Sequence, residues 1–97
     1  MPYFRVLLNG ENFWLEMAEG PSRVGFFTTR YVEAQDEHEA EHKAISMVQL
    51  APQLKDALNV PSNPPLIYCE RITPLKAFTP EDVVQPGFMF YFIEPDA

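Results

Sequence analysis

Residues 24–34 read Val-Gly-Phe-Phe-Thr-Thr-Arg-Tyr-Val-Glu-Ala, and they lead through Asp36 into the acidic segment 37–50. β-Branched and aromatic residues fill this stretch, which is typical of a strand. Because side chains alternate across a strand, the stretch should present two distinct faces. These faces carry Phe27, Thr29 and Tyr31 on one side and Phe26, Thr28, Arg30, Val32 and Ala34 on the other. The pattern predicts one long strand that feeds one helix.

The segment 37–50 is predicted to be a helix capped by Asp36. Asp36 is a good N-cap, and Glu39 three residues later makes a close relative of the capping box. Pro52 ends the helix because it lacks the N–H of the i→i−4 hydrogen bond, and it suits the start of a short second helix. The residues that this arrangement turns inward are Ala40, Ala44, Met47, Val48 and Ala51 in the main helix and Leu54 and Leu58 after Pro52.

Further strands complete the predicted fold. They lie at residues 3–8, 12–17, 66–73 and 88–93, with a loop at 20–22, a rigid proline connector at 59–65 and a helical turn at 79–84. Asn9-Gly10 is expected to be a type I′ hairpin turn, since both residues tolerate positive φ. The predicted class is α+β, in the order β-β-β-α-β-β. A sheet of about five mostly antiparallel strands carries one main helix on one face, and residues 1–97 form one small domain.

The segment 38–42, His-Glu-Ala-Glu-His, matches H-E-x-x-H, the signature of zinc proteases. That chemistry needs two histidines on one helical face, a third ligand and a water-poor cleft. A helical wheel places His38 and His42 nearly opposite the apolar face, towards solvent. Glu39 is already explained by the helix cap. We therefore predict no metal site and no cofactor, and keep metal binding or hydrolysis at His38-Glu39-Ala40-Glu41-His42 as the alternative.

Charge and cysteine content restrict the partners that this chain could have. A net charge of −7, with scattered basic residues, argues against nucleic acid as a partner. No stretch approaches the roughly 20 apolar residues that cross a bilayer, and no signal peptide is evident, so no membrane partner is predicted. The lone cysteine, Cys69, excludes an intramolecular disulfide framework and fits a reducing compartment. The expected location is cytoplasmic.

The aromatic content exceeds what one helix can cover. A helix of about 14 residues spans roughly 21 Å, and the final strand is almost entirely apolar, as in strands covered on both faces. We expect an open sheet face that binds a second copy or a ligand, with one crowded core under loops as the alternative. The candidate residues for this surface are Arg30, Tyr31, Tyr68, Glu70, Arg71, Phe90 and Phe92.

Two arginines, Arg30 and Arg71, lie in mid-strand among apolar neighbours, where arginine is depleted unless it is paired. A cross-strand salt bridge is expected, with an anion site as the alternative. The candidate carboxylate partners are Glu16, Glu33 and Glu70. In the strand 66–73, alternation places Tyr68, Glu70 and Ile72 on one face and Ile67, Cys69 and Arg71 on the other.

Residues 25–34, the acidic helix after them and residues 64–68, Pro-Pro-Leu-Ile-Tyr, resemble a group of small uncharacterised bacterial α+β proteins with no assigned activity. The resemblance implies a bacterial, cytoplasmic protein and no particular chemistry. We expect a non-catalytic association or binding module that acts as a homodimer or as a subunit of a complex.

Overall fold

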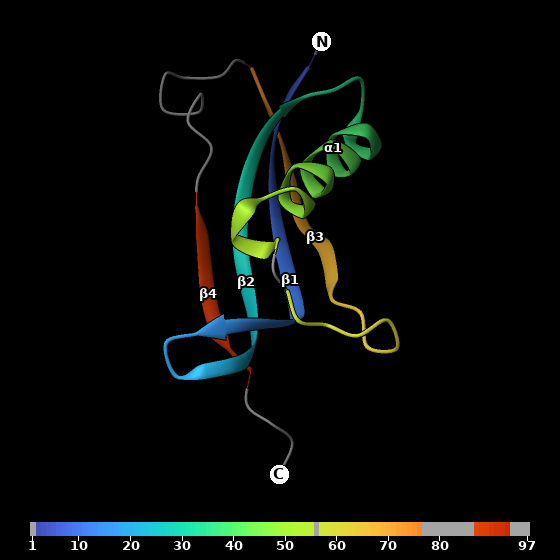
Figure 1. Ribbon diagram of the computed structural model, residues 1–97. Helices are drawn as coiled ribbons and strands as arrows, with labels where there is room; N and C mark the ends of the chain where they lie inside the picture. Colours follow the sequence, from blue (N-terminus) through green and yellow to red (C-terminus); the bar gives the residue numbers. More distant parts are fainter. Residues whose placement is uncertain (1, 56, 77–86, 94–97) are drawn as a thin grey trace.

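The computed structural model of the protein describes residues 2–55, 57–76 and 87–93. It confirms an α+β fold with one helix on one face of an antiparallel sheet (Figure 1). Within the described residues the sheet has four strands, in the order β3-β1-β2-β4. The elements are β1 (Tyr3–Met17), β2 (Gly20–Glu33), α1 (Glu37–Gln49), the 3-10 turn η1 (Pro52–Leu54), β3 (Leu66–Leu75) and β4 (Phe88–Phe92). The helical turn predicted at 79–84 lies outside the described residues.

The predicted hairpin at Asn9-Gly10 is wrong, because β1 continues through both residues as one long strand. The turn that joins β1 to β2 lies at residues 18–19. Gly10 pairs with Phe26 on β2, and a Cβ on Gly10 would lie 2.2 Å from the ring atom Cε2. Glycine is therefore required here for the close packing of a ring and not for a turn. The first two predicted strands are one, which leaves four strands instead of five in the described part of the chain.

β1 passes this point by shifting its register between Gly10 and Phe13. Asn12 has φ 62°, in the left-handed region that asparagine tolerates better than most residues. Its Nδ2 donates to Oδ1 of Asn63 at 2.9 Å, which ties this bulge to the connector before β3. Residues 20–22, predicted as a loop, pair with the part of β1 beyond the bulge.

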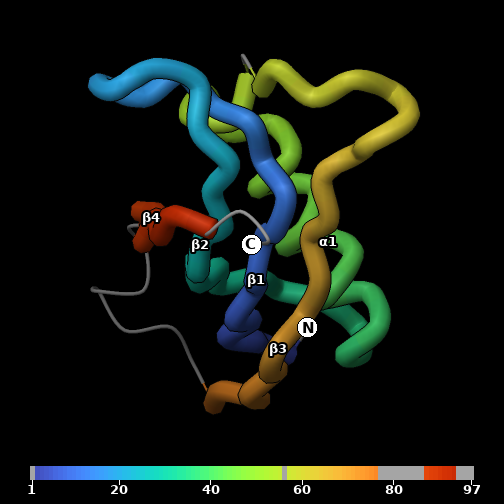
Figure 2. The backbone as a smooth tube through the Cα atoms, turned by 90° about the horizontal axis from the view of Figure 1, so that it is seen from below, coloured from blue at the N-terminus to red at the C-terminus, as the bar shows by residue number. Residues whose placement is uncertain are grey.

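The core lies between α1 and the sheet face that turns towards it. α1 packs on β1, β2 and β3, whereas β4 forms the edge of the sheet that is farther from the helix (Figure 2). The predicted alternation of β2 is confirmed, since its alternate residues from Val24 to Val32 are buried. The buried apolar side chains are Phe4, Val6, Leu8, Phe13, Leu15, Val24, Phe26, Val32, Ala34, Ala40, Ala44, Val48 and Leu54.

The predicted start of the helix is confirmed. The backbone N–H of Glu39 donates to Oδ1 of Asp36 at 2.8 Å, and Oε1 of Glu39 accepts from the N–H of Gln35 at 3.3 Å. The buried residues of α1 are Ala40, Ala44 and Val48, as the wheel predicts. The 3-10 turn buries Leu54, but Leu58 is 49% exposed, so the predicted inward placement of Leu58 is wrong.

Gly10→Ala should lower the free energy of unfolding by about 1–3 kcal/mol, as overpacking does in other cores. Phe26 resists displacement, because its buried ring packs against the rings of Phe13, Phe88 and Phe90. Gly87→Ala is the matched control, since a Cβ there meets nothing within 4 Å. Denaturant unfolding measures both changes. Equal midpoints for Gly10→Ala and the unmodified protein would contradict the packing role.

Candidate functional site

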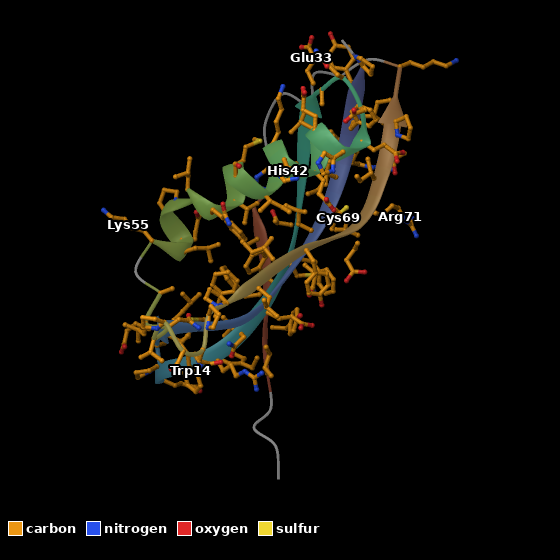
Figure 3. The ribbon with its side chains drawn as sticks, turned by 90° about the vertical axis from the view of Figure 1, so that its right-hand side faces the viewer. Trp14, Glu33, His42, Lys55, Cys69 and Arg71 are labelled. Carbon is orange, nitrogen blue, oxygen red and sulfur yellow. The ribbon has the colours of Figure 1, made fainter. Side chains whose placement is uncertain are left out.

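Two surfaces of the sheet lie outside this core: the face opposite α1, which we term the open face, and the edge strand β4. Figure 3 shows Arg71 on the side of the sheet away from α1 and Cys69 on the side towards it. The open face carries Tyr3, Arg5, Leu7 and Asn9 from β1, Phe27, Thr29 and Tyr31 from β2, Tyr68, Arg71 and Thr73 from β3, and Met89 and Tyr91 from β4.

A bulge in β3 decides which of its side chains reach the open face. Leu7 pairs with Arg71, and the next residue of β1 pairs with Cys69, so Glu70 is the extra residue. Arg71 therefore joins Tyr68 on the open face, where simple alternation had placed the two on opposite faces. The residue after Arg71 turns towards the core instead. The predicted alternation of this strand is wrong beyond Cys69 for this reason.

Asn9 lies at the centre of an aromatic cluster on the open face. It pairs with Phe27 on one side and with Tyr68 on the other. Its Nδ2 donates to the hydroxyl of Tyr91 at 3.1 Å, and the Tyr91 ring lies over Gly25, where a Cβ would be 2.4 Å from Cζ. Asn9 is only 3% exposed, and its Oδ1 accepts no hydrogen bond within the described residues. The residue predicted to turn the chain is thus a buried polar group among three rings.

Tyr68, in the same cluster, is held as a neutral phenol. The hydrogen bond from its hydroxyl to the carboxylate of Glu11 is the main cause that raises the pKa of Tyr68 to about 12. Burial and the negative charges of Glu11 and Glu70 raise this pKa further in the same direction. The Tyr68 hydroxyl therefore keeps its proton at neutral pH.

Arg5 and Arg71 are neighbours beside this cluster on the open face. Arg5 pairs with Thr73 and Arg71 pairs with Leu7, so the two arginines take diagonal positions on adjacent strands. Together with Thr29, these residues line a cavity of about 120 Å³. Within the described residues neither guanidinium has a carboxylate at ion-pair distance, so the salt bridge expected for Arg71 is not found there.

Arg30 lies on the other face of the sheet, within the core. Its Nη1 donates to the hydroxyl of Thr28 and to the carbonyl of Thr29, and its guanidinium lies 5.2 Å from the centre of the Phe88 ring. Burial lowers the pKa of Arg30. Tyr31, the next residue, faces the open side opposite Arg5. The predicted candidate residues are therefore divided between the two faces and do not form one surface.

Phe90 and Phe92 lie on β4, on the α1 side of the sheet. Phe90 pairs with the buried Phe26, yet it is 37% exposed, and Phe92 is 60% exposed. Met89, on the open face, is 71% exposed. Among the described residues β4 pairs with β2 alone, so it is an edge strand. The strand predicted to be covered on both faces is thus apolar on both faces and only partly covered by the described part of the chain.

His38 and His42 are exposed on α1, as the wheel predicts, with ring centroids 4.5 Å apart. In the described part of the chain no group of three or more His, Cys, Asp or Glu side chains is arranged to hold a metal ion. Glu39 between them is engaged at the cap, and its Oε1 also lies 3.4 Å from Nζ of Lys43. The two histidines lie on an exposed helical surface, and the open cavity of about 520 Å³ beside it is lined by Glu39 and His42 but not by His38.

Cys69 is half buried on the α1 side of β3. Burial is the main cause that raises the pKa of its thiol, and the negative charge of Glu41 adds to the rise. A raised pKa reduces the thiolate fraction, so this arrangement does not activate Cys69 as a nucleophile.

The sequence analysis missed Arg5, Asn9 and Tyr91 as members of the open face. Reading residues 3–17 as one continuous strand would have placed Arg5 and Asn9 on one face by alternation.

Comparison of the chain with protein-family models, curated proteins and solved structures gives no match in any of the three. None of the helices in the described ranges has the length and apolarity that a membrane crossing requires.

Purified protein should contain no stoichiometric zinc, because His38 and His42 are exposed and the described residues supply no third ligand. Elemental analysis after purification without a chelator measures this. Replacing both histidines by alanine should change the free energy of unfolding by less than about 0.5 kcal/mol, as for other surface positions. One tightly bound zinc per chain, lost in the double variant, would show that a third ligand exists.

Tyr68 should ionise at a higher pH than an ordinary tyrosine side chain. Its folded pKa of about 12 lies above the ordinary value of 10.0, so its stabilising contribution is complete below pH 10 and is lost between about 10 and 12. Tyrosinate absorbance follows the titration. Glu11→Gln should move the late step towards the ordinary pKa, whereas Tyr31→Phe should leave it in place. A late step that survives in Tyr68→Phe would assign it to another residue.

Proposed function

We propose that this protein is a non-catalytic association module that forms a homodimer by joining the β4 strands of two copies edge to edge. The observation that carries the proposal is the exposure of Met89, Phe90 and Phe92 on an edge strand that pairs, among the described residues, with β2 alone. An exposed apolar edge invites pairing with another chain, and native proteins usually cover or blunt such edges. Pairing with a second copy covers it.

Backbone geometry supports pairing at this edge. The N–H of Ile93, the residue after β4, donates to the carbonyl of Arg23 on β2 at 3.0 Å. In an antiparallel ladder, pairs that exchange hydrogen bonds alternate with pairs that do not. The backbone groups of alternate residues of β4 therefore point away from β2. The residues whose N–H and C=O groups face the free edge are Phe88, Phe90 and Phe92.

The register of β4 also suits a two-fold axis. Phe90 is the middle residue of the strand and faces the free edge with its backbone. An antiparallel copy centred there pairs Phe90 with Phe90 of the second copy, and Phe88 with Phe92 of the second copy. Every outward backbone group of the strand then has a partner, and the phenylalanines of both copies lie on one face. Registers centred on another residue pair fewer of these groups.

Charge supports the second copy as the partner. β4 contains no charged residue, although the chain as a whole carries −7. Two acidic molecules therefore meet at this edge without placing like charges directly opposite each other, which would oppose association. Metal-dependent hydrolysis at His38 and His42 has no third ligand among the described residues, so we do not propose it. We propose a cytoplasmic location on the lone Cys69, which has no cysteine partner in the chain.

Light scattering at micromolar concentration should report twice the mass of the 11.2 kDa chain. Phe92→Glu should give the monomer mass, because it places a charge opposite the apolar Phe88 of the second copy, and charged side chains on an edge strand oppose edge-to-edge pairing. Val60→Glu is the matched control: Val60 is 56% exposed on the connector before β3, so the same new charge should leave the dimer intact.

A second variant separates backbone pairing from side-chain contact. Phe92→Pro removes an N–H that points to the free edge and leaves the hydrogen bonds to β2 in place, so it should also give a monomer. Circular dichroism should report the same sheet signal for all variants. A monomeric unmodified protein, or equal masses for Phe92→Glu and Val60→Glu, would exclude association through this strand.

A further inference from the structure

The open face joins a cationic end to an aromatic end. We propose that it binds a small organic anion whose carboxylate or phosphate group lies between Arg5 and Arg71 and whose planar apolar ring packs against Phe27 and Tyr68. This site is separate from the edge of β4, because sheet extension about the proposed two-fold axis leaves the open face uncovered. The proposal therefore does not depend on the homodimer.

The cationic end is a pair of like charges without a described counterion. Arg5 and Arg71 occupy diagonal positions on β1 and β3, within reach of long side chains, and neither has a carboxylate at ion-pair distance among the described residues. Two positive side chains at diagonal positions attract an anion more strongly than either does alone. Guanidinium groups also present paired N–H donors that match the oxygens of carboxylate and phosphate groups.

The cavity between the arginines has the size and lining for one oxyanion group. Its volume of about 120 Å³ is too small for a whole drug-sized ligand, since such pockets span roughly 300–1,000 Å³. Thr29 and Thr73 bring hydroxyl donors to the cavity, and Leu7 lies between them as an apolar residue. The remainder of a ligand must therefore extend over the neighbouring surface.

That neighbouring surface is aromatic. Asn9 follows Leu7 on the same face of β1, about 7 Å further along the strand. Phe27 and Tyr68 flank Asn9 in register, and each is 39% exposed. A planar ring attached directly to the anionic group would reach these two side chains. Aromatic pairs of this kind contribute about 0.5–1.5 kcal/mol beyond the area that they bury.

Glu11 limits the charge that such a ligand can carry. Its carboxylate accepts the hydrogen bond of Tyr68 at the far end of the aromatic cluster. A second anionic group at that end of the ligand would meet this carboxylate, and like charges repel. The ligand class is therefore a ring with one anionic end and an uncharged far end.

Titration with phenyl phosphate, benzoate and inorganic phosphate, followed by NMR of the labelled protein, tests the proposal. Phenyl phosphate or benzoate should shift the amide signals of Leu7, Thr29 and Thr73 and the ring signals of Phe27 and Tyr68. Inorganic phosphate should bind at least about tenfold more weakly than phenyl phosphate, because it lacks the ring. Tighter binding of phenyl phosphate identifies a phosphate ligand and tighter binding of benzoate a carboxylate ligand, and either result supports the site.

The matched variants are Arg71→Gln and Lys55→Gln, which remove one positive charge each. Lys55 is exposed after η1, far from the open face (Figure 3). Arg71→Gln should weaken phenyl phosphate binding by about tenfold or more, as expected for the loss of a charged hydrogen bond, while Lys55→Gln should leave it unchanged. The proposal is wrong if neither aromatic anion binds, if the shifted signals lie elsewhere, or if both variants weaken binding equally.

Discussion

The contact between Gly10 and the ring of Phe26 is the constraint on which the rest of this structure depends. Gly10 lies on the central strand β1, and the absence of a side chain there lets the Phe26 ring lie against the backbone. The same ring packs against Phe13 beyond the bulge and against Phe88 and Phe90 on β4. One glycine thus joins the two halves of β1, the neighbouring strand and the edge strand in a single aromatic core.

This arrangement determines what remains exposed. The helix α1 packs on β1, β2 and β3. The side chains of Phe90 and Phe92 on β4 are therefore more exposed to solvent than Phe26 on β2. Continuation of β1 through Gly10 also places Asn9 in mid-strand, where its Nδ2 donates to the hydroxyl of Tyr91 on the same open face. The two proposed surfaces, an edge for a second copy and an open face for an anion, both follow from this one strand path.

Arginine placement shows how small backbone irregularities redistribute charge. Arg30 follows simple alternation and is buried, with threonine oxygens and the Phe88 ring as partners. Arg71 is turned to the open face only because Glu70 is an extra residue in the bulge of β3. Without that bulge Arg71 would face the core, and Arg5 would have no cationic neighbour on the open face. The candidate site therefore depends on a one-residue shift in register.

Local sequence determined the elements that local physics controls. The cap at Asp36, the buried stripe of α1, the two faces of β2 and the apolar character of β4 all follow from spacing and side-chain chemistry. Tertiary structure alone decided the path at Asn9-Gly10 and the bulge at Glu70. The physical reason is that Asn9-Gly10 fits an extended strand as well as a hairpin turn, and neither residue has a positive φ here. The choice between them was made by the Phe26 ring, sixteen residues from Gly10 in the chain, and no local pattern contains that contact.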